Sequence, residues 1–130
     1  MRILDLINWI KGRVPYDFYP NEFQRDSPDA SAYIRIYPGE GVDSDTGKRI
    51  PHFQVLVRGD VEAYPETEEK SNEIFNAITN QRDIWIGNEY VVQIKAQGSA
   101  PFYIGLDENR RPVYSMNFRA IIKPNLKGEK

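Results

Sequence analysis

Apolar residues near the start of the chain recur every three or four positions, as they do along the buried face of an amphipathic helix. The residues that follow this spacing are Ile3, Leu6, Ile7, Ile10 and Val14. Gly12 lies near the end of the pattern, and Pro15 cannot continue a helix. The pattern therefore predicts a first helix over residues 2–11.

Residues 16–30 show neither helical nor strand periodicity, and Pro20 and Pro28 introduce turns within them. This aromatic loop contains the rings of Tyr16, Phe18, Tyr19 and Phe23. A solvated linker would be far more polar, so we expect the loop to pack on something. Two interpretations stay open: the rings cap the core of this chain, or some of them contact a partner, because Tyr and Phe are enriched in interface cores.

Alternating apolar and polar residues predict two strands after the aromatic loop. In residues 32–37, the side chains that share the polar face are Tyr33, Arg35 and Tyr37. In residues 52–58, the side chains expected to point inward are Phe53, Val55 and Val57. A polar loop with three glycines, residues 38–51, connects the two strands.

A second helix is expected to begin at Pro65, which suits a first turn, and to end near Asn80. Glutamates in its first turn are favoured by the helix dipole, and Glu66 is placed to pair with Lys70 one turn later. Its buried stripe consists of Thr67, Ser71, Ile74 and Ile78.

The remaining chain predicts two hairpins. Residues 84–86 and 90–96 flank a glycine–asparagine turn, which is a good hairpin signal. Residues 102–106 and 113–122 flank a polar turn at residues 107–112.

The predicted fold class is α+β, with the element order α-β-β-α-β-β-β-β. Each helix must bury its apolar stripe, so we expect two helices packed on one face of a mainly antiparallel sheet. The opposite face would carry Tyr33, Arg35, Gln54, Arg58, Gln93 and Lys95, facing water or another subunit. Residues 1–122 form a single domain of ordinary size, and residues 123–130 form a charged tail that we expect to be flexible.

Composition narrows the function classes. The chain of 130 residues has no cysteine, which excludes disulfide frameworks and cysteine-based zinc sites or catalysis. Its 17 basic and 19 acidic residues give a formal net charge of -2, which disfavours a dedicated nucleic-acid binder. We expect no membrane segment, no signal peptide and synthesis in the cytoplasm, because no apolar run approaches the ~20 residues of a membrane helix.

The sequence contains no complete pattern for a catalytic or metal-binding site. His52 is the single histidine, too few for a histidine metal site or a catalytic triad. The segment from Asp43 begins like a calcium loop, but Lys48 replaces the required glycine and Gln54 the required glutamate. We therefore predict no catalytic residue, no cofactor and no metal.

Two segments carry a family resemblance: the loop YPNEFQRDSPD and the hairpin APFYIGLDENRRPVYSMNF. Over residues 4–122 the chain resembles the small minor capsid proteins of long-tailed bacteriophages, which are grouped with the tail terminators. The resemblance implies an α+β protein that forms a six-membered ring at the head-proximal end of the tail tube. Such a ring stops tube growth, offers the surface on which the filled head docks, and lets DNA pass through its lumen.

The partners implied are other copies of the chain, the major tail tube protein and the head-completion or stopper protein, with no membrane involved. The chain would reside in the virion at the head–tail junction, after assembly in the host cytoplasm. A closed ring needs heterologous contacts, in which one patch meets a different patch on the neighbour.

Candidate interface residues are Tyr16, Phe18, Tyr19, Phe23, Arg25, Tyr33 and Tyr37. Candidate lumen or docking charges are Lys48, Arg49, Arg110 and Arg111. The alternatives are a head-side stopper or adaptor protein and a small ligand-binding module, which would need a deep pocket with converging polar groups.

Overall fold

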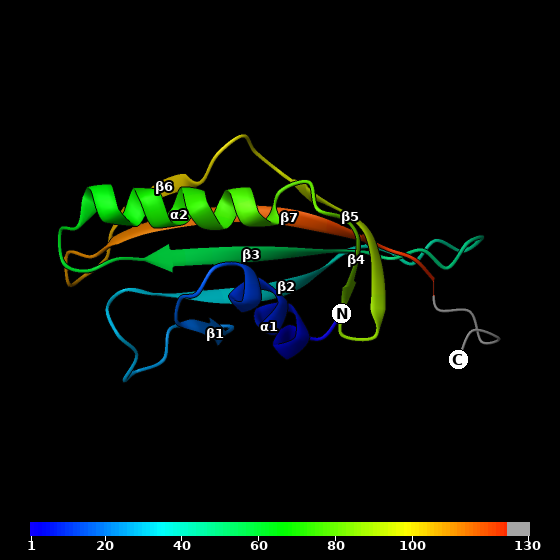
Figure 1. Cartoon of the computed structure of the whole chain (residues 1–130), viewed down its shortest axis with the longest axis horizontal. Coiled ribbons are helices and arrows are strands. Elements are labelled where there is room, and N and C mark those ends of the chain that lie inside the picture. The colour runs from blue at the N-terminus through cyan, green and yellow to red at the C-terminus, as the bar shows by residue number, and fades with distance from the viewer. Residues whose placement is uncertain (125–130) are drawn as a thin grey trace.

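The structure, a computed structural model, describes residues 1–124 (Figure 1). The helices are α1 (Ile3–Arg13) and α2 (Tyr64–Ile78). The strands are β1 (Phe18–Pro20), β2 (Ser31–Glu40), β3 (Ile50–Arg58), β4 (Arg82–Ile86), β5 (Glu89–Ala96), β6 (Phe102–Leu106) and β7 (Pro112–Ile122). The predicted α+β class and element order are confirmed, with the short β1 as an addition. Residues 125–130, most of the predicted charged tail, lie outside the described residues.

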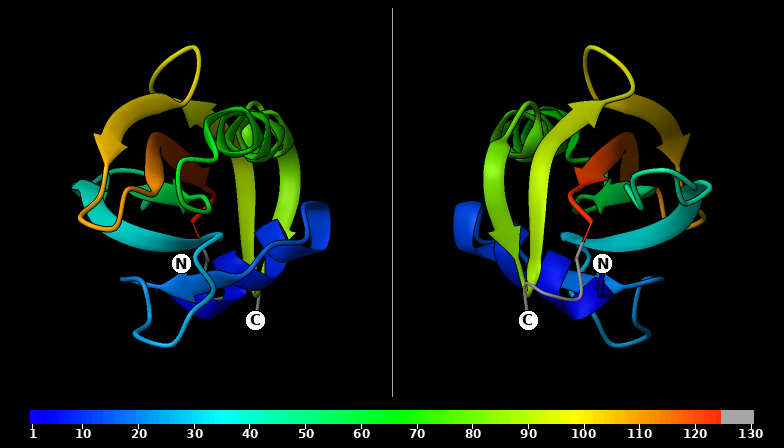
Figure 2. Two further views of the ribbon diagram at one scale, coloured as in Figure 1. Left: turned by 90° about the vertical axis from the view of Figure 1, so that its left-hand side faces the viewer. Right: turned by 90° about the vertical axis from the view of Figure 1, so that its right-hand side faces the viewer.

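The sheet has the strand order β1-β2-β3-β7-β5-β4, and β6 pairs with β7 beside this path. Strand pairs are antiparallel except β1 with β2, which are parallel. β7 is the longest strand and pairs with three others: β3 along its length, β6 at its start and β5 at its end. Figure 2 shows that the sheet curves strongly, with β4 and β5 turned away from the direction of the other strands.

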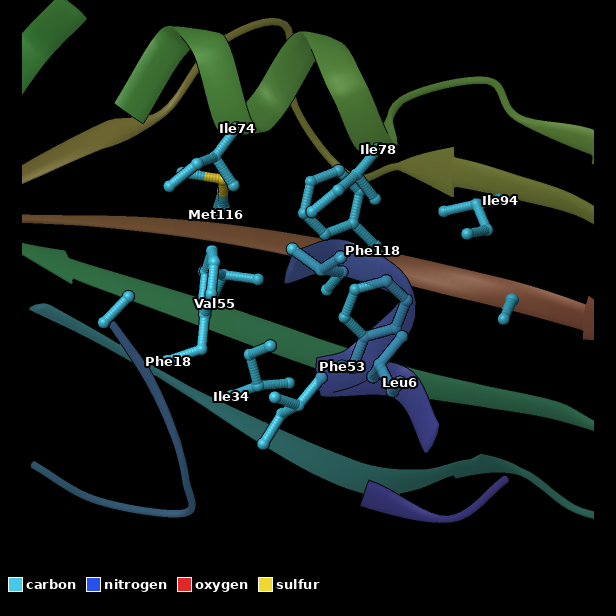
Figure 3. Close-up of a cluster of buried hydrophobic side chains, with 14 of the residues drawn as sticks. Leu6, Phe18, Ile34, Phe53, Val55, Ile74, Ile78, Ile94, Met116 and Phe118 are labelled. Carbon is cyan, nitrogen blue, oxygen red and sulfur yellow. The ribbon is translucent and has the colours of Figure 1, made fainter. Parts of the chain in front are cut away.

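Both helices bury their apolar stripes in one core on the inner face of the sheet. α1 contributes Leu6, Ile7 and Ile10, and α2 contributes Ile74, Phe75 and Ile78. Figure 3 shows Ile74 and Ile78 directed toward Met116 and Phe118 of β7. The rings of Phe53 and Phe118, from neighbouring strands, stack with centroids 5.1 Å apart. Burial of each such side chain stabilises the fold by about 1.5–3 kcal/mol. The sheet face that carries these side chains is therefore the one that the helices cover.

Three local details differ from the expectations. α1 continues two residues past the predicted end to Arg13, because Gly12 does not break it and the N–H of Val14 still bonds to the carbonyl of Ile10. Lys70 pairs with Glu73 at 2.9 Å rather than with Glu66. β1 forms inside the loop that showed no periodicity, because it pairs with β2 across the sheet.

The outer face of the sheet follows from the register, since residues paired across strands share a face. Cross-strand pairing aligns Lys95, Arg119, His52 and Tyr37 in one row across four strands. None of the helices in the described part of the chain is long and apolar enough to cross a membrane.

Candidate assembly surfaces

The buried guanidinium of Arg58 connects the aromatic loop to the sheet through hydrogen bonds. Arg58 ends β3, and the residue is 5% exposed. Its Nε donates to the carbonyl of Asp29 at 2.8 Å, and its Nη2 donates to the carbonyl of Pro28 at 3.0 Å. Nη2 also lies 3.2 Å from the hydroxyl oxygens of Ser27 and Ser31. A planar guanidinium can make several bonds at once, so one side chain shapes the end of the loop.

The ring of Phe23 packs over the Arg58 guanidinium. The guanidinium carbon of Arg58 lies 4.1 Å from the centroid of the Phe23 ring, and the Phe23 ring meets Tyr33 edge-on at 4.8 Å. Burial lowers the pKa of Arg58, and the nearby Arg111 lowers it further. A guanidinium nevertheless stays charged at neutral pH, so the ring covers a cation. The ring of Phe23 therefore makes contacts within its own chain, with Arg58 and Tyr33.

Arg111 makes a second tie to the same loop. Its Nε bonds to Oδ2 of Asp107 at 2.8 Å, and its Nη1 bonds to Oδ1 of Asp29 at 2.8 Å. The Arg111 side chain is 16% exposed. Asp107 also accepts from the backbone N–H groups of Asn109 and Arg111, at 2.9 Å each. Arg111 thus joins the β6–β7 turn to the aromatic loop, and its guanidinium is paired within its own chain.

The structure separates the predicted interface aromatics into buried and exposed groups. Phe18 is 5% exposed and belongs to the core, which corrects its assignment as a surface contact. The hydroxyl of Tyr16 donates to the carbonyl of Arg58 at 2.8 Å, and burial is the main reason that its pKa rises to about 12. Tyr19 and Tyr33 are half-buried, while Tyr37 and Arg25 are exposed. The core interpretation therefore holds for Phe18 and in part for Tyr16, and contact of the other residues with a partner stays a prediction.

The four predicted lumen or docking charges lie in two separate places and do not form one patch. Arg110 and Arg111 lie in the turn at the start of β7, whereas Lys48 and Arg49 lie in the β2–β3 loop beside its end. β7 has 11 residues, so the two pairs are separated by roughly 30 Å. Arg110 is also paired with Glu62 at 2.7 Å.

A run of three consecutive exposed apolar residues lies on β6, which was predicted only as an ordinary strand. Phe102, Tyr103 and Ile104 are 68%, 42% and 53% exposed. Within the described residues β6 pairs only with β7, so its other edge is open. Tyr103 turns toward the helix side, 6.4 Å from Tyr64. Consecutive large apolar residues without polar alternation were the signal in the sequence, because a half-buried strand normally alternates.

The single histidine lies on the outer face of the sheet. His52 Nε2 has no hydrogen-bond partner and lies 3.7 Å from Oε2 of Glu40, which also pairs with Arg119 at 3.3 Å. Residues 1–124 contain no group of three His, Cys, Asp or Glu side chains that could hold a metal ion. What the described surfaces offer is exposed apolar residues, charges and an open strand edge.

These features define an α+β protein with a run of exposed apolar residues along an open sheet edge, a property of chains that associate with other chains. The family model described as bacteriophage tail terminator protein matches residues 16–124. The chain therefore belongs to the bacteriophage tail terminator family, and it is a structural protein of phage tail assembly.

Solved structures share the fold at low sequence identity. One is described as the virion of a native gene transfer agent particle, with a TM-score of 0.62 and 14% identity over 88% of this chain and 84% of that chain. A second has a TM-score of 0.53 and 13% identity over 94% of this chain and 92% of that chain. No curated protein sequence matches the chain.

Proposed function

We propose that this chain is the subunit of a ring at the head-proximal end of the tail tube. The ring ends polymerisation of the tube and provides the surface on which the filled head docks. Its partners are other copies of itself, the major tail tube protein and the head-completion or stopper protein. DNA passes through the lumen without sequence-specific binding, and the chain performs no catalysis.

The observation that carries this proposal is the exposed apolar edge of β6. An open strand edge with large apolar side chains favours association with another chain, and natural monomers usually cover or charge such edges. Phe102, at 68% exposed, and Ile104, at 53% exposed, are neither covered nor charged. Together with family membership, this edge supports a protein that completes its burial in an assembly.

The aromatic loop supports the same proposal in a second way. Ties from Arg58 and Arg111 hold residues 27–29 in place before any partner is met. A surface that is ordered in advance loses less conformational entropy on binding. Tyr37, Tyr19 and Arg25 remain as contacts for a neighbour or the tube.

The test is deletion of the gene from the phage that encodes it, followed by electron microscopy of the lysate. We expect overlong tails without attached heads, and restoration of normal length when the purified protein is added. Tails of normal length beside heads that lose their DNA would instead indicate a head-side stopper and refute the proposal.

A further inference from the structure

The outer face of the sheet is positively charged. Arg35 and Lys95 are exposed on it, and neither forms an ion pair within residues 1–124. Arg119, between them in the sheet, is paired with Glu40. Tyr37 and Phe102 add exposed aromatic surface to the same face, since Tyr37 pairs across strands with His52 and Phe102 with Ser115. We name these residues the basic sheet face.

The exposed side of α2 has the opposite sign. The helix sequence YPETEEKSNEIFNAI contains four glutamates and one lysine, which gives a net charge of -3. Glu66, Glu69 and Glu73 follow one another at spacings of three and four, so they form one stripe. Glu73 is paired with Lys70, whereas Glu66 and Glu69 form no ion pair within residues 1–124. This acidic helix stripe lies opposite the buried residues Ile74 and Ile78.

The two surfaces lie on opposite sides of the molecule. α2 covers the inner face of the sheet, so its exposed stripe points away from the basic sheet face (Figures 1 and 2). Glu66 to Glu73 spans about 10 Å of helix. The row from Lys95 to Tyr37 crosses three strand spacings, or roughly 15 Å. Opposite patches on opposite sides produce a head-to-tail contact that can repeat around a ring.

We propose that the basic sheet face of one copy docks on the acidic helix stripe of the next copy. This inference rests on the ring of the proposed function and assigns the two sides of its subunit contact. Charge complementarity sets the register and selects the partner, while Tyr37 and Phe102 provide apolar burial around the charges.

A second copy fits the basic sheet face better than a nucleic acid does. Proteins that bind duplex DNA commonly neutralise about 6–10 phosphates. Within residues 1–124, the exposed cations without an ion pair on this face are fewer: Arg35, Lys95 and Arg82, which pairs across strands with Gln93. The whole chain has a formal net charge of -2, which repels a polyanion. The acidic helix stripe, by contrast, is present on every copy.

The experiment uses two charge-reversed full-length proteins. One carries Arg35→Glu with Lys95→Glu, and the other carries Glu66→Lys with Glu69→Lys. Each alone should place like charges across every contact, whereas an equal mixture of the two restores opposite charges in an alternating ring. A protein with all four substitutions restores them within one chain. The control, Arg2→Glu with Lys11→Glu, makes the same reversal of two positive charges at exposed positions at the start of the chain.

The readout is restoration of tail length and infectious particles in a lysate that lacks the gene, with circular dichroism to confirm folding. Each reversed protein alone should lose activity at least about tenfold, because like charges across an interface cost several kcal/mol. The mixture, the fourfold variant and the control should retain activity within about threefold of the wild type, a difference below ~1 kcal/mol.

Other outcomes overturn the assignment. Full activity of both reversed proteins would refute the docking of these two faces while leaving the ring function intact. Failure of the basic-face variant in every combination, with the helix variant active, would indicate a polyanion or another protein on that face. Failure of the wild-type protein itself to restore tails would refute the proposed function instead.

Discussion

The ring of Phe23 covers the guanidinium group of Arg58 at 4.1 Å, although the two residues come from a loop and a strand end 35 positions apart. This pair closes the aromatic loop over the outer face of the sheet. This pair explains how a chain segment without periodicity becomes ordered. The buried guanidinium donates hydrogen bonds to two backbone carbonyls of the loop, and the ring shields the guanidinium from water.

Replacement of Arg58 should therefore destabilise the fold. Arg58→Met keeps much of the side-chain volume but leaves the carbonyls of Asp29 and Pro28 without their donor, at a cost of roughly 2–4 kcal/mol. Urea unfolding monitored by circular dichroism measures this loss. The matched control is Arg35→Met on the exposed part of the same face, which should change stability by less than ~0.5 kcal/mol. Equal effects would contradict the role of Arg58.

Phe18 and Tyr37 should respond in opposite ways to truncation. Phe18→Ala removes a core ring and should lower the free energy of unfolding by about 3–5 kcal/mol. Tyr37→Ala removes an exposed ring and should leave the isolated chain nearly as stable as before. Thermal unfolding of both variants separates the two roles, and a stable Phe18→Ala protein would show that this ring is not part of the core.

Prediction from the sequence succeeded where local periodicity and burial agree. The stripe of Thr67, Ser71, Ile74 and Ile78 is buried as expected, because helical spacing alone determines which residues share a face. It failed at β1, whose three residues form a strand only because β2 lies beside them. Tertiary pairing of this kind leaves no trace in a short segment.

The candidate surface was less predictable than the fold. Arg58 was expected on the outer face, and it lies there, but its own aromatic loop covers it. Arg110 and Arg111 are candidate lumen or docking charges in the sequence, and the structure pairs them with acidic residues distant in sequence, Glu62 and Asp29. Ion pairs between remote segments depend on the fold and cannot be read from a list of charged positions.

Tyr16 should make the fold sensitive to alkaline pH. Burial raises its pKa to about 12, so the folded state holds the phenolic proton more tightly than the unfolded chain, in which a tyrosine titrates near pH 10. The associated stability is complete below pH 10 and is lost as the pH rises toward 12. Tyr16→Phe should reduce this pH dependence in urea unfolding between pH 9 and 12. Identical slopes for the two proteins would contradict the shift.

The β6 edge should matter for assembly and not for folding. Phe102→Ser with Ile104→Ser changes side chains that are 68% and 53% exposed, so the unfolding free energy should fall by less than about 1 kcal/mol. Restoration of tail length by the same protein should fall at least about tenfold, since an interface that loses central apolar contacts loses 1.4 kcal/mol or more. Leu4→Ser, at a residue 60% exposed on α1, is the control. Normal activity of the double variant would remove β6 from the interface.

Pairing of β6 with β7 has a mechanical consequence. β7 also holds β3 and β5, so a pull applied at the β6 edge passes directly into the strand with the most backbone bonds to its neighbours. Tension from a neighbouring subunit would be spread across the sheet and would bypass the loops.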